Sequence, residues 1–241
     1  MSIAANTKTT IRQMEPGKIF DYRIFKEFDE SPAPVIKAVN RLVEHGLVKR
    51  LSKGKFYKPE KGFFGTRKPS DAELLKTVLF ANEKRRGYIT GVSLHNKLGL
   101  TTQLPNTITV AVNGSRQKKD FGTFKVVTKP TRAPIKEEYV ELLQYLDVLS
   151  EASKIMDADI NRTLKIISKN VAALDHRKRS KLTNLAVDFY GAKTRATLGL
   201  LLSSLKLPIP AKLAKAVNPT TSFKLNLDVD AWPLAKHWNI K

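Results

Sequence analysis

The chain has 241 residues, with 43 Lys and Arg against 22 Asp and Glu, so its formal net charge at pH 7 is +21. A hydrophobic fraction of 41% excludes disorder over the whole chain. The absence of cysteine excludes disulfides, thiolate metal sites and a cysteine nucleophile. No apolar run approaches the roughly 18–20 residues of a membrane span, and the first ten residues lack the apolar segment of a secretory signal. We therefore expect a cytoplasmic protein that does not enter a membrane.

The positive charge is concentrated in the first half of the chain. Residues 1–68 hold 15 basic and 7 acidic side chains, residues 69–136 hold 12 and 4, and residues 137–241 hold 16 and 11. This excess favours a polyanionic partner, and the alternative is that the charge serves only solubility.

Three short helices and a hairpin are expected in the first 60 residues. A weak helix over 7–14 is followed by a Glu-Pro-Gly breaker, and an apolar stripe predicts a second helix over 19–28. A third helix starts at Pro32 or Pro34 and ends at Gly46. The runs 47–51 and 56–57 are typical of strands joined by a compact turn at 52–55.

A linker is expected over 61–69, and a mixed region follows it. Helices are predicted from residue 70 or 71 to about 84 and over 90–98. Strands over 107–112 and 121–128 are predicted to form a hairpin around Asn113-Gly114. From residue 135 onward the pattern is helical, over 137–150, 159–173, 179–190, 194–205 and 211–217. Trp232 and Trp238 near the C-terminus indicate either anchors on their own domain or a tail that binds a partner.

These elements predict an α+β protein that is mostly α. Residues 1–60 would form a winged helix-turn-helix domain, 61–134 a small mixed α/β middle region, and 135–241 a helical bundle with a Trp-containing tail. We found no convincing internal repeat.

Polar and basic residues of the predicted winged helix are candidates for DNA binding. Asn and Arg suit bidentate reading of adenine and guanine edges in the major groove, and Lys suits phosphate. The alternatives are a solvated helix face or a surface that binds protein. The candidate DNA-binding residues are Ser31, Lys37, Asn40, Arg41, Lys49, Arg50, Lys53 and Lys55.

Other basic clusters are weaker candidates, and signals for catalysis are poor. The clusters 84–86 and 116–119 could add phosphate contacts or could be ordinary solvated loops, and 176–179 is weaker still. The four histidines, His45, His95, His176 and His237, show none of the HxH, HxxxH or HExxH spacings of metal sites. Phosphate-binding loops and GxSxG elbows are absent as well. We expect no enzyme activity, no metal and no cofactor.

Several segments resemble AbiEi-type antitoxins. The stretch 35–59, VIKAVNRLVEHGLVKRLSKGKFYKP, is similar to the N-terminal winged helix of that family. The stretch 96–114, NKLGLTTQLPNTITVAVNG, resembles its segment in which LGLsTQvP precedes a strand. The run TRATLGLL at 194–201 is similar to its vRAlLGalL helix, and NPTTSFKL and KHWNIK near the end also match.

The resemblance implies the antitoxin of a bacterial type IV toxin–antitoxin module. Such proteins repress their own operon by binding double-stranded operator DNA, and their toxins are nucleotidyltransferase-like enzymes that they oppose without a stable complex. A homodimer on a palindromic operator is compatible with this role. We hypothesise that residues 133–241 are needed to neutralise the toxin, while residues 1–68 are needed only for repression. The alternative function is that of an RNA-binding or nucleic-acid-processing accessory protein.

Overall fold

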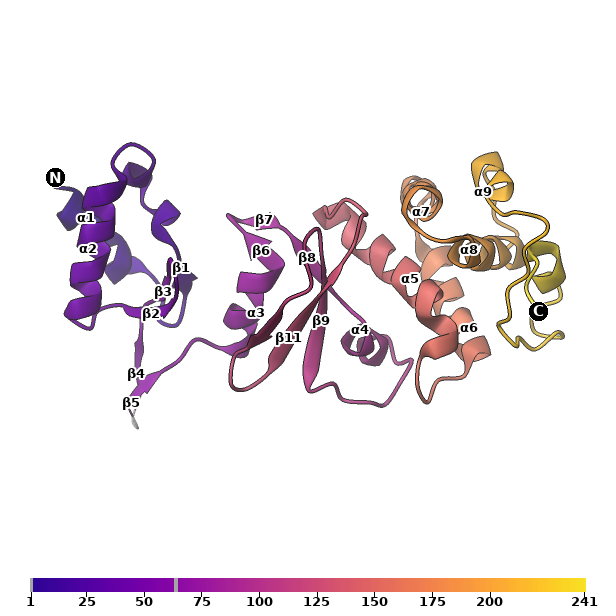
Figure 1. Cartoon of the computed structure of the whole chain (residues 1–241), viewed down its shortest axis with the longest axis horizontal. Helices are drawn as coiled ribbons and strands as arrows, with labels where there is room; N and C mark the ends of the chain where they lie inside the picture. Colours follow the sequence, from indigo (N-terminus) through magenta and orange to yellow (C-terminus); the bar gives the residue numbers. More distant parts are fainter. Residues whose placement is uncertain (1, 63–64) are drawn as a thin grey trace. The chain divides into compact units, whose positions relative to one another are not determined.

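A computed structural model describes residues 2–62 and 65–241 of the chain. It has mixed α and β structure, and its contacts divide the chain into two compact units, Met1–Lys84 and Arg85–Lys241 (Figure 1). This grouping differs from the three predicted regions, because residues of the predicted middle region and of the helical region share one core. That core includes Tyr88, Leu94 and Ala111 together with Leu142 and Leu146.

The first unit is built around two helices and a three-stranded sheet. Helix α1 (Ile3–Gln13) and helix α2 (Pro32–Glu44) pack on each other, and the sheet has the order β1–β3–β2. Its strands are β1 (Ile19–Phe20), β2 (Lys49–Ser52) and β3 (Lys55–Tyr57). The apolar face predicted for the third helix is confirmed, because Val35, Val39 and Leu42 of α2 are buried. They share a core with Ile11, Phe20, Phe25, Val48 and Phe56.

The helix predicted over 19–28 is wrong. Phe20 lies in β1, opposite Phe56 of β3, and two 3-10 turns follow at Tyr22–Ile24 and Lys26–Phe28. The carboxylate of Asp21 accepts a hydrogen bond from the Arg23 amide at 2.8 Å and so starts a turn directly after the strand. The spacing of the aromatic residues fits one face of a helix. In the structure their rings instead reach the core from the strand and the turns that follow it.

The segment predicted as a linker contains a short hairpin. Strands β4 (Glu60–Gly62) and β5 (Gly65–Arg67) pair in antiparallel fashion, and Phe63 and Phe64 between them lie outside the described residues. Helix α3 (Asp71–Leu79) then buries Leu74 and Val78 within the first unit. It ends five residues before the predicted end at about residue 84. Strands β6 (Phe80–Ala81) and β7 (Lys84–Arg85) replace its last turn.

The second unit begins with a four-stranded sheet of order β10–β11–β9–β8. The elements are β8 (Gly87–Thr90), α4 (Val92–Lys97), β9 (Thr107–Val112), β10 (Lys118–Asp120) and β11 (Lys125–Pro130). Strands β9 and β11 are parallel, with Thr107 opposite Lys125, so the hairpin predicted around Asn113-Gly114 is wrong. The chain leaves β9 there, and β11 pairs in antiparallel fashion with β10 instead.

Helices make up the rest of the second unit. They are α5 (Val140–Glu151), α6 (Ile160–Ala173), α7 (His176–Phe189), α8 (Ala192–Ser204) and α9 (Ala211–Lys215), with 3-10 turns at Glu137–Tyr139, Ala152–Lys154 and Ala235–Trp238. Helix α8 is buried on nearly all sides, from Ala196 to Leu202, because the helices α5, α6, α7 and α9 and the last 3-10 turn all pack on it. None of the described helices is long and apolar enough to cross a membrane.

The tryptophans of the C-terminal segment are anchors on their own unit. Trp232 and Trp238 are each only 4% exposed. The indole Nε1 of Trp238 donates a hydrogen bond to Ser203 Oγ of α8 at 2.8 Å. An isolated parallel bridge joins Phe223 to Ile240 and holds the segment in place. The first of the two readings of these residues is therefore confirmed.

Candidate nucleic-acid interface

The outer face of α2 is polar because its apolar residues face the core. Lys37 and Arg41 are exposed, and Asn40 between them is half-buried. These positions lie three and four residues apart and so share one side of the helix. The same face forms a shallow hollow, lined by Ala33, Ile36, Lys37, Asn40, Arg41 and Glu44. Ser31, just before the helix, is half-buried, and its side chain forms no capping hydrogen bond.

A hydrogen bond links this helix face to strand β2. Arg50 Nη2 donates to Asn40 Oδ1 at 3.1 Å, and the Arg50 guanidinium lies over the Phe56 ring, 5.4 Å from its centroid. The ring and the amide therefore hold the guanidinium beside α2. Helix and hairpin present one continuous polar surface.

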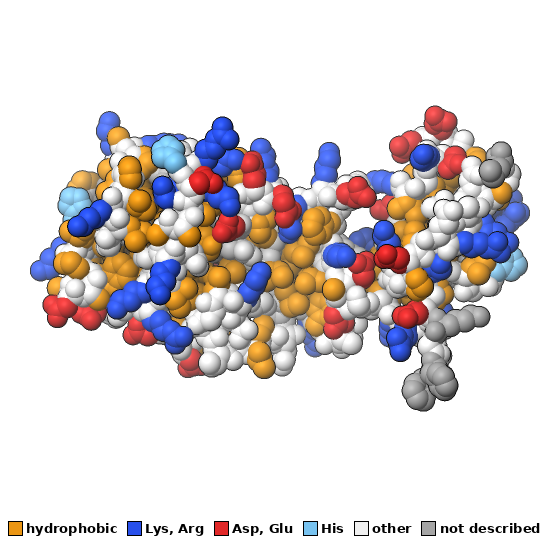
Figure 2. Space-filling model, turned by 180° about the vertical axis from the view of Figure 1, so that it is seen from behind, with side chains coloured by type: hydrophobic (Ala, Val, Ile, Leu, Met, Phe, Trp, Pro, Cys, Tyr) orange, Lys and Arg blue, Asp and Glu red, His pale blue; other side chains and the backbone are white. Residues whose placement is uncertain are grey.

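The β2–β3 hairpin adds two exposed ammonium groups. Lys49 and Lys53 are exposed, and Gly54 has the positive φ of 71° that its tight turn requires. Within the described residues, Lys37, Arg41, Lys49, Arg50 and Lys53 form no ion pair with a carboxylate. Figure 2 shows Lys and Arg side chains, in blue, on the visible face of both units.

Lys55 is placed differently from the other candidates. Its side chain is half-buried, and its Nζ donates to the carbonyl oxygen of Thr77 in α3 at 3.2 Å. It therefore connects β3 to α3, and its ammonium group is less available to a ligand than that of Lys53.

The other basic clusters are partly engaged within the second unit. Arg85 forms a two-point ion pair with Glu137, with Nη2 and Oε1 2.9 Å apart. Lys178 and Lys181 pair with Glu141 and Glu138. In the cluster 116–119, burial lowers the pKa of half-buried Lys119, and the positive charge of Arg86 lowers it further.

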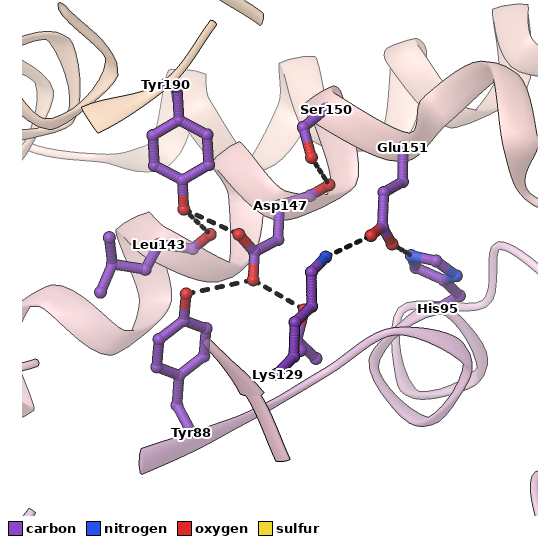
Figure 3. A network of polar contacts seen from close by, with 9 residues as sticks. Tyr88, His95, Lys129, Leu143, Asp147, Ser150, Glu151 and Tyr190 are labelled. Carbon is purple, nitrogen blue, oxygen red and sulfur yellow. Dashed lines mark hydrogen bonds and ion pairs between the residues drawn. The ribbon is translucent and has the colours of Figure 1, made fainter. Parts of the chain in front are cut away.

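A buried polar network was not predicted. The carboxylate of Asp147 on α5 is 8% exposed and accepts three hydrogen bonds, from Tyr88 Oη at 3.1 Å, Thr90 Oγ1 at 2.7 Å and Tyr190 Oη at 2.7 Å (Figure 3). The three donors come from β8 and from the residue after α7, so the carboxylate joins the sheet to two helices. Four residues before Asp147, the carbonyl oxygen of Leu143 also accepts from Tyr190 Oη, at 3.3 Å.

Burial dominates the titration of this network. Desolvation raises the pKa of Asp147, although its three hydroxyl donors and Lys129 act in the opposite direction. Desolvation also raises the pKa values of Tyr88 and Tyr190, and the charge of Asp147 adds to both shifts. Both phenols therefore remain protonated donors. A single Asp in an apolar helix carries no sequence signal for its three partners, because they lie 59, 57 and 43 residues away.

The described residues offer no metal site, since no three His, Cys, Asp or Glu side chains among them lie close enough to share an ion. His95 is the buried histidine of the four, at 5% exposure.

Comparison with known proteins gives a family and a likeness to solved structures. A crystal structure of the RV2827C protein from Mycobacterium tuberculosis is 15% identical, with a TM-score of 0.48, over 93% of this chain and 85% of that chain. The comparison with curated proteins gave no significant match. The model of a family of unknown function, DUF6088, matches residues 6–174. The chain therefore belongs to the DUF6088 family.

Proposed function

We propose that the first unit is a winged helix-turn-helix domain that binds operator DNA, and that the protein is an AbiEi-like antitoxin repressing its own operon. The observation that carries the proposal is the continuous polar surface of α2 and the β2–β3 hairpin. It holds five cationic side chains that have no acidic partner among the described residues.

The parts of this surface have different chemistry. On α2, Asn40 and Arg41 would reach base edges in the major groove, while half-exposed Ile36 offers apolar contact to a thymine methyl group. On the hairpin, Lys49 and Lys53 would bind phosphate. Ser31 and Lys37, at the start and first turns of α2, would bind the backbone beside the groove.

The Asn40–Arg50 hydrogen bond makes it less favourable in free energy for Asn40 to bind a base edge. An amide that binds adenine must give up its bond to Arg50, or Arg50 must turn toward a phosphate at the same time. We expect the second outcome, because the guanidinium lies at the surface beside the helix and a phosphate is its stronger acceptor.

The antitoxin part of the proposal rests on the resemblance of the segments 96–114, 194–201 and the C-terminal stretch. These segments belong to the second unit, which would oppose a nucleotidyltransferase-like toxin. The net positive charge of that unit is spread over paired and unpaired side chains, so it is less suited to bulk phosphate than the first unit.

Binding to two duplexes tests DNA recognition. Fluorescence anisotropy would compare the duplex upstream of the protein's own gene with a scrambled duplex of equal length and composition. We expect tighter binding to the first duplex and a log–log salt slope of roughly −4 to −7, from about 5–8 phosphate contacts. Equal affinity for both duplexes at moderate salt would contradict a repressor role.

Growth rescue tests the antitoxin role separately. The downstream toxin gene would be co-expressed with the wild-type protein or with an Asn40→Ala/Arg41→Ala double variant, from a promoter unrelated to the operon. We expect the double variant to lose repression and to rescue growth. Loss of rescue at normal protein levels would mean that DNA binding and neutralisation are not separable.

A further inference from the structure

A cavity of about 390 Å³ lies within the second unit, and none of the candidate DNA-binding residues lines it. Helix α4, strands β9 and β11, and the end of α5 with the segment that follows it contribute its walls. The polar lining includes His95, Lys129, Glu151 and Lys154, and the apolar lining includes Ile155 and Met156. This volume and this mixture of groups are typical of a site for a small ligand.

His95 brings unused hydrogen-bonding capacity to the cavity. Its side chain is 6% exposed, and its Nε2 has no hydrogen-bond partner among the described residues. Glu151 Oε2 lies 3.7 Å from this nitrogen, and the dashed line between the two residues in Figure 3 marks that ion-pair distance, which is too long for a hydrogen bond. Burial lowers the pKa of His95, the charge of Glu151 opposes this shift and that of Lys129 adds to it, so the environment favours the neutral ring. A buried nitrogen without a partner is costly unless a ligand satisfies it.

The charges around the cavity do not balance. Lys129 Nζ lies 2.5 Å from Glu151 Oε1, so these two charges offset each other. Lys154 is exposed and has no acidic partner among the described residues, which leaves one positive charge in excess among the residues that line the cavity. Lys193 lies near enough for the charge of Lys154 to lower its pKa, in addition to the larger effect of desolvation. The opening therefore favours an anion.

The apolar part of the lining is unusually open to solvent. Met156 is 68% exposed and Val92 is 37% exposed, while Ile155 is 8% exposed. The loop that carries Met156 is held to the loop before β9, because Gln103 Nε2 donates to Asp157 Oδ2 at 3.1 Å. An apolar group of a ligand would cover these side chains and gain free energy from their burial.

We propose that this cavity binds a small organic anion. Its charged group lies by Lys154, its apolar part packs on Ile155, Met156 and Val92, and a polar group of the ligand completes the hydrogen bonding of His95. The site is independent of the proposed DNA binding, whose residues all belong to the first unit.

Three probes separate the features of this ligand, each added to the full-length protein and followed through the imidazole resonances. The probes are benzoate, which has charge and an apolar ring, benzamide, which lacks the charge, and inorganic phosphate, which lacks the ring. His45, His176 and His237 are internal controls for the His95 signal. We expect benzoate to shift the His95 resonances saturably, with a Kd on the order of millimolar for so small a probe, and benzamide and phosphate to bind at least about 5-fold more weakly.

Each contrary result would overturn the proposal. Equal binding of benzamide would remove the anion requirement, and equal binding of phosphate would remove the apolar contact. No His95 shift with any of the probes, or equal shifts of all four histidines, would remove the site.

Charge reversal at the opening is the matched test. Lys154→Glu and Lys215→Glu change the net charge equally, but Lys215 is an exposed residue of α9 that does not line the cavity. We expect the first variant to weaken benzoate binding roughly 5–10-fold and the second to leave it within about 2-fold. Equal weakening by both variants would show that only the overall charge matters, and the proposal would fail.

Discussion

The indole ring of Trp238 lies so close to Gly199 of α8 that no side chain fits between the helix and the ring. A Cβ atom built on Gly199 would overlap the six-membered part of the indole far inside van der Waals contact. The same ring is fixed from its other end by the hydrogen bond to Ser203, one helical turn further along α8. Glycine is therefore used here for close approach, within a helix where it otherwise lowers stability.

A methyl group at this position should loosen the C-terminal segment. We expect Gly199→Ala to lower the free energy of unfolding by up to about 2 kcal/mol, because overpacking costs ~1–3 kcal/mol and helix propensity returns only ~1 kcal/mol. Urea unfolding of the purified protein measures this. Gly114→Ala is the control, since a Cβ there meets only Val112 Cγ2 at 3.9 Å. In a Trp238→Ala background the cost of Gly199→Ala should disappear, and a cost that persists would place its origin elsewhere.

The buried network around Asp147 predicts both a stability loss and a pH effect. Asp147→Ala leaves the buried hydroxyl groups of Tyr88 and Thr90 without their acceptor, and leaves Tyr190 Oη only the Leu143 carbonyl oxygen. It should cost about 3 kcal/mol or more, while Tyr190→Phe removes one donor and should cost about 1–2 kcal/mol. The contacts are those of Figure 3, and thermal or urea unfolding is the measurement. A cost below that of Tyr190→Phe for the Asp147 variant would contradict the central role of the carboxylate.

The pH dependence follows from the raised pKa of Asp147. Between the unfolded value of about 3.9 and the higher folded value, the folded state binds more protons, so stability falls as pH rises through this window. Asp147→Asn cannot titrate, so the stability of the wild type relative to this variant should decrease from pH 4 to pH 7. A difference that grows with pH would show that the hydrogen bonds, and not burial, control this group.

The two parts of the proposed DNA-binding surface should respond differently to substitution. Asn40→Ala or Arg41→Ala should cost about 1–3 kcal/mol on the operator and flatten the sequence preference. Lys53→Ala should weaken all duplexes alike and reduce the salt slope by about one unit. Lys55→Ala should change the slope less, because its ammonium group is bound to the Thr77 carbonyl oxygen. Lys76→Ala is a control, since Lys76 is paired with Glu73 on α3. A sequence preference that survives both α2 substitutions would move recognition elsewhere.

Fragments should be cut where the units divide. Residues 1–84 should fold and bind operator DNA within about 3-fold of the full chain, because α3 completes the first unit through Leu74, Val78 and the Lys55–Thr77 bond. Residues 1–68 lack α3 and should be less stable in urea. Likewise residues 133–241 lack the strands that share the core with α5, so neutralisation is better tested with residues 85–241. Equal stability of the 68- and 84-residue fragments would show that α3 adds nothing.

Local patterns were enough for elements whose apolar face is regular. The helices over 32–44 and 160–173 follow from apolar spacing, because each buries one continuous stripe. The same rule failed at Phe20, Phe25 and Phe28, where three aromatic residues reach the core from a strand and two 3-10 turns. The parallel pairing of β9 and β11 was not predicted either. It depends on the strand β10 between them in sequence, for which the local sequence shows no strand pattern.

For the candidate site, exposure could be predicted and contacts could not. Lys37, Arg41, Lys49 and Lys53 are exposed, as expected of charged residues opposite an apolar stripe or in a turn. The hydrogen bonds from Arg50 to Asn40 and from Lys55 to Thr77 depend on how separate helices and strands pack together. The cavity beside His95 depends on the same packing.

The position of β10 at the edge of its sheet indicates a structural role for the basic cluster at 116–119. β10 is an outer strand of its sheet, next to β11 alone, and it carries Lys118 and Lys119. An outer strand exposes backbone groups that another sheet could pair with, and lysines on such a strand oppose that pairing. Lys118 and Lys119 therefore oppose aggregation through this edge of the sheet, independently of any binding of nucleic acid by the cluster. Replacing these lysines should lower the highest concentration at which the protein remains monodisperse.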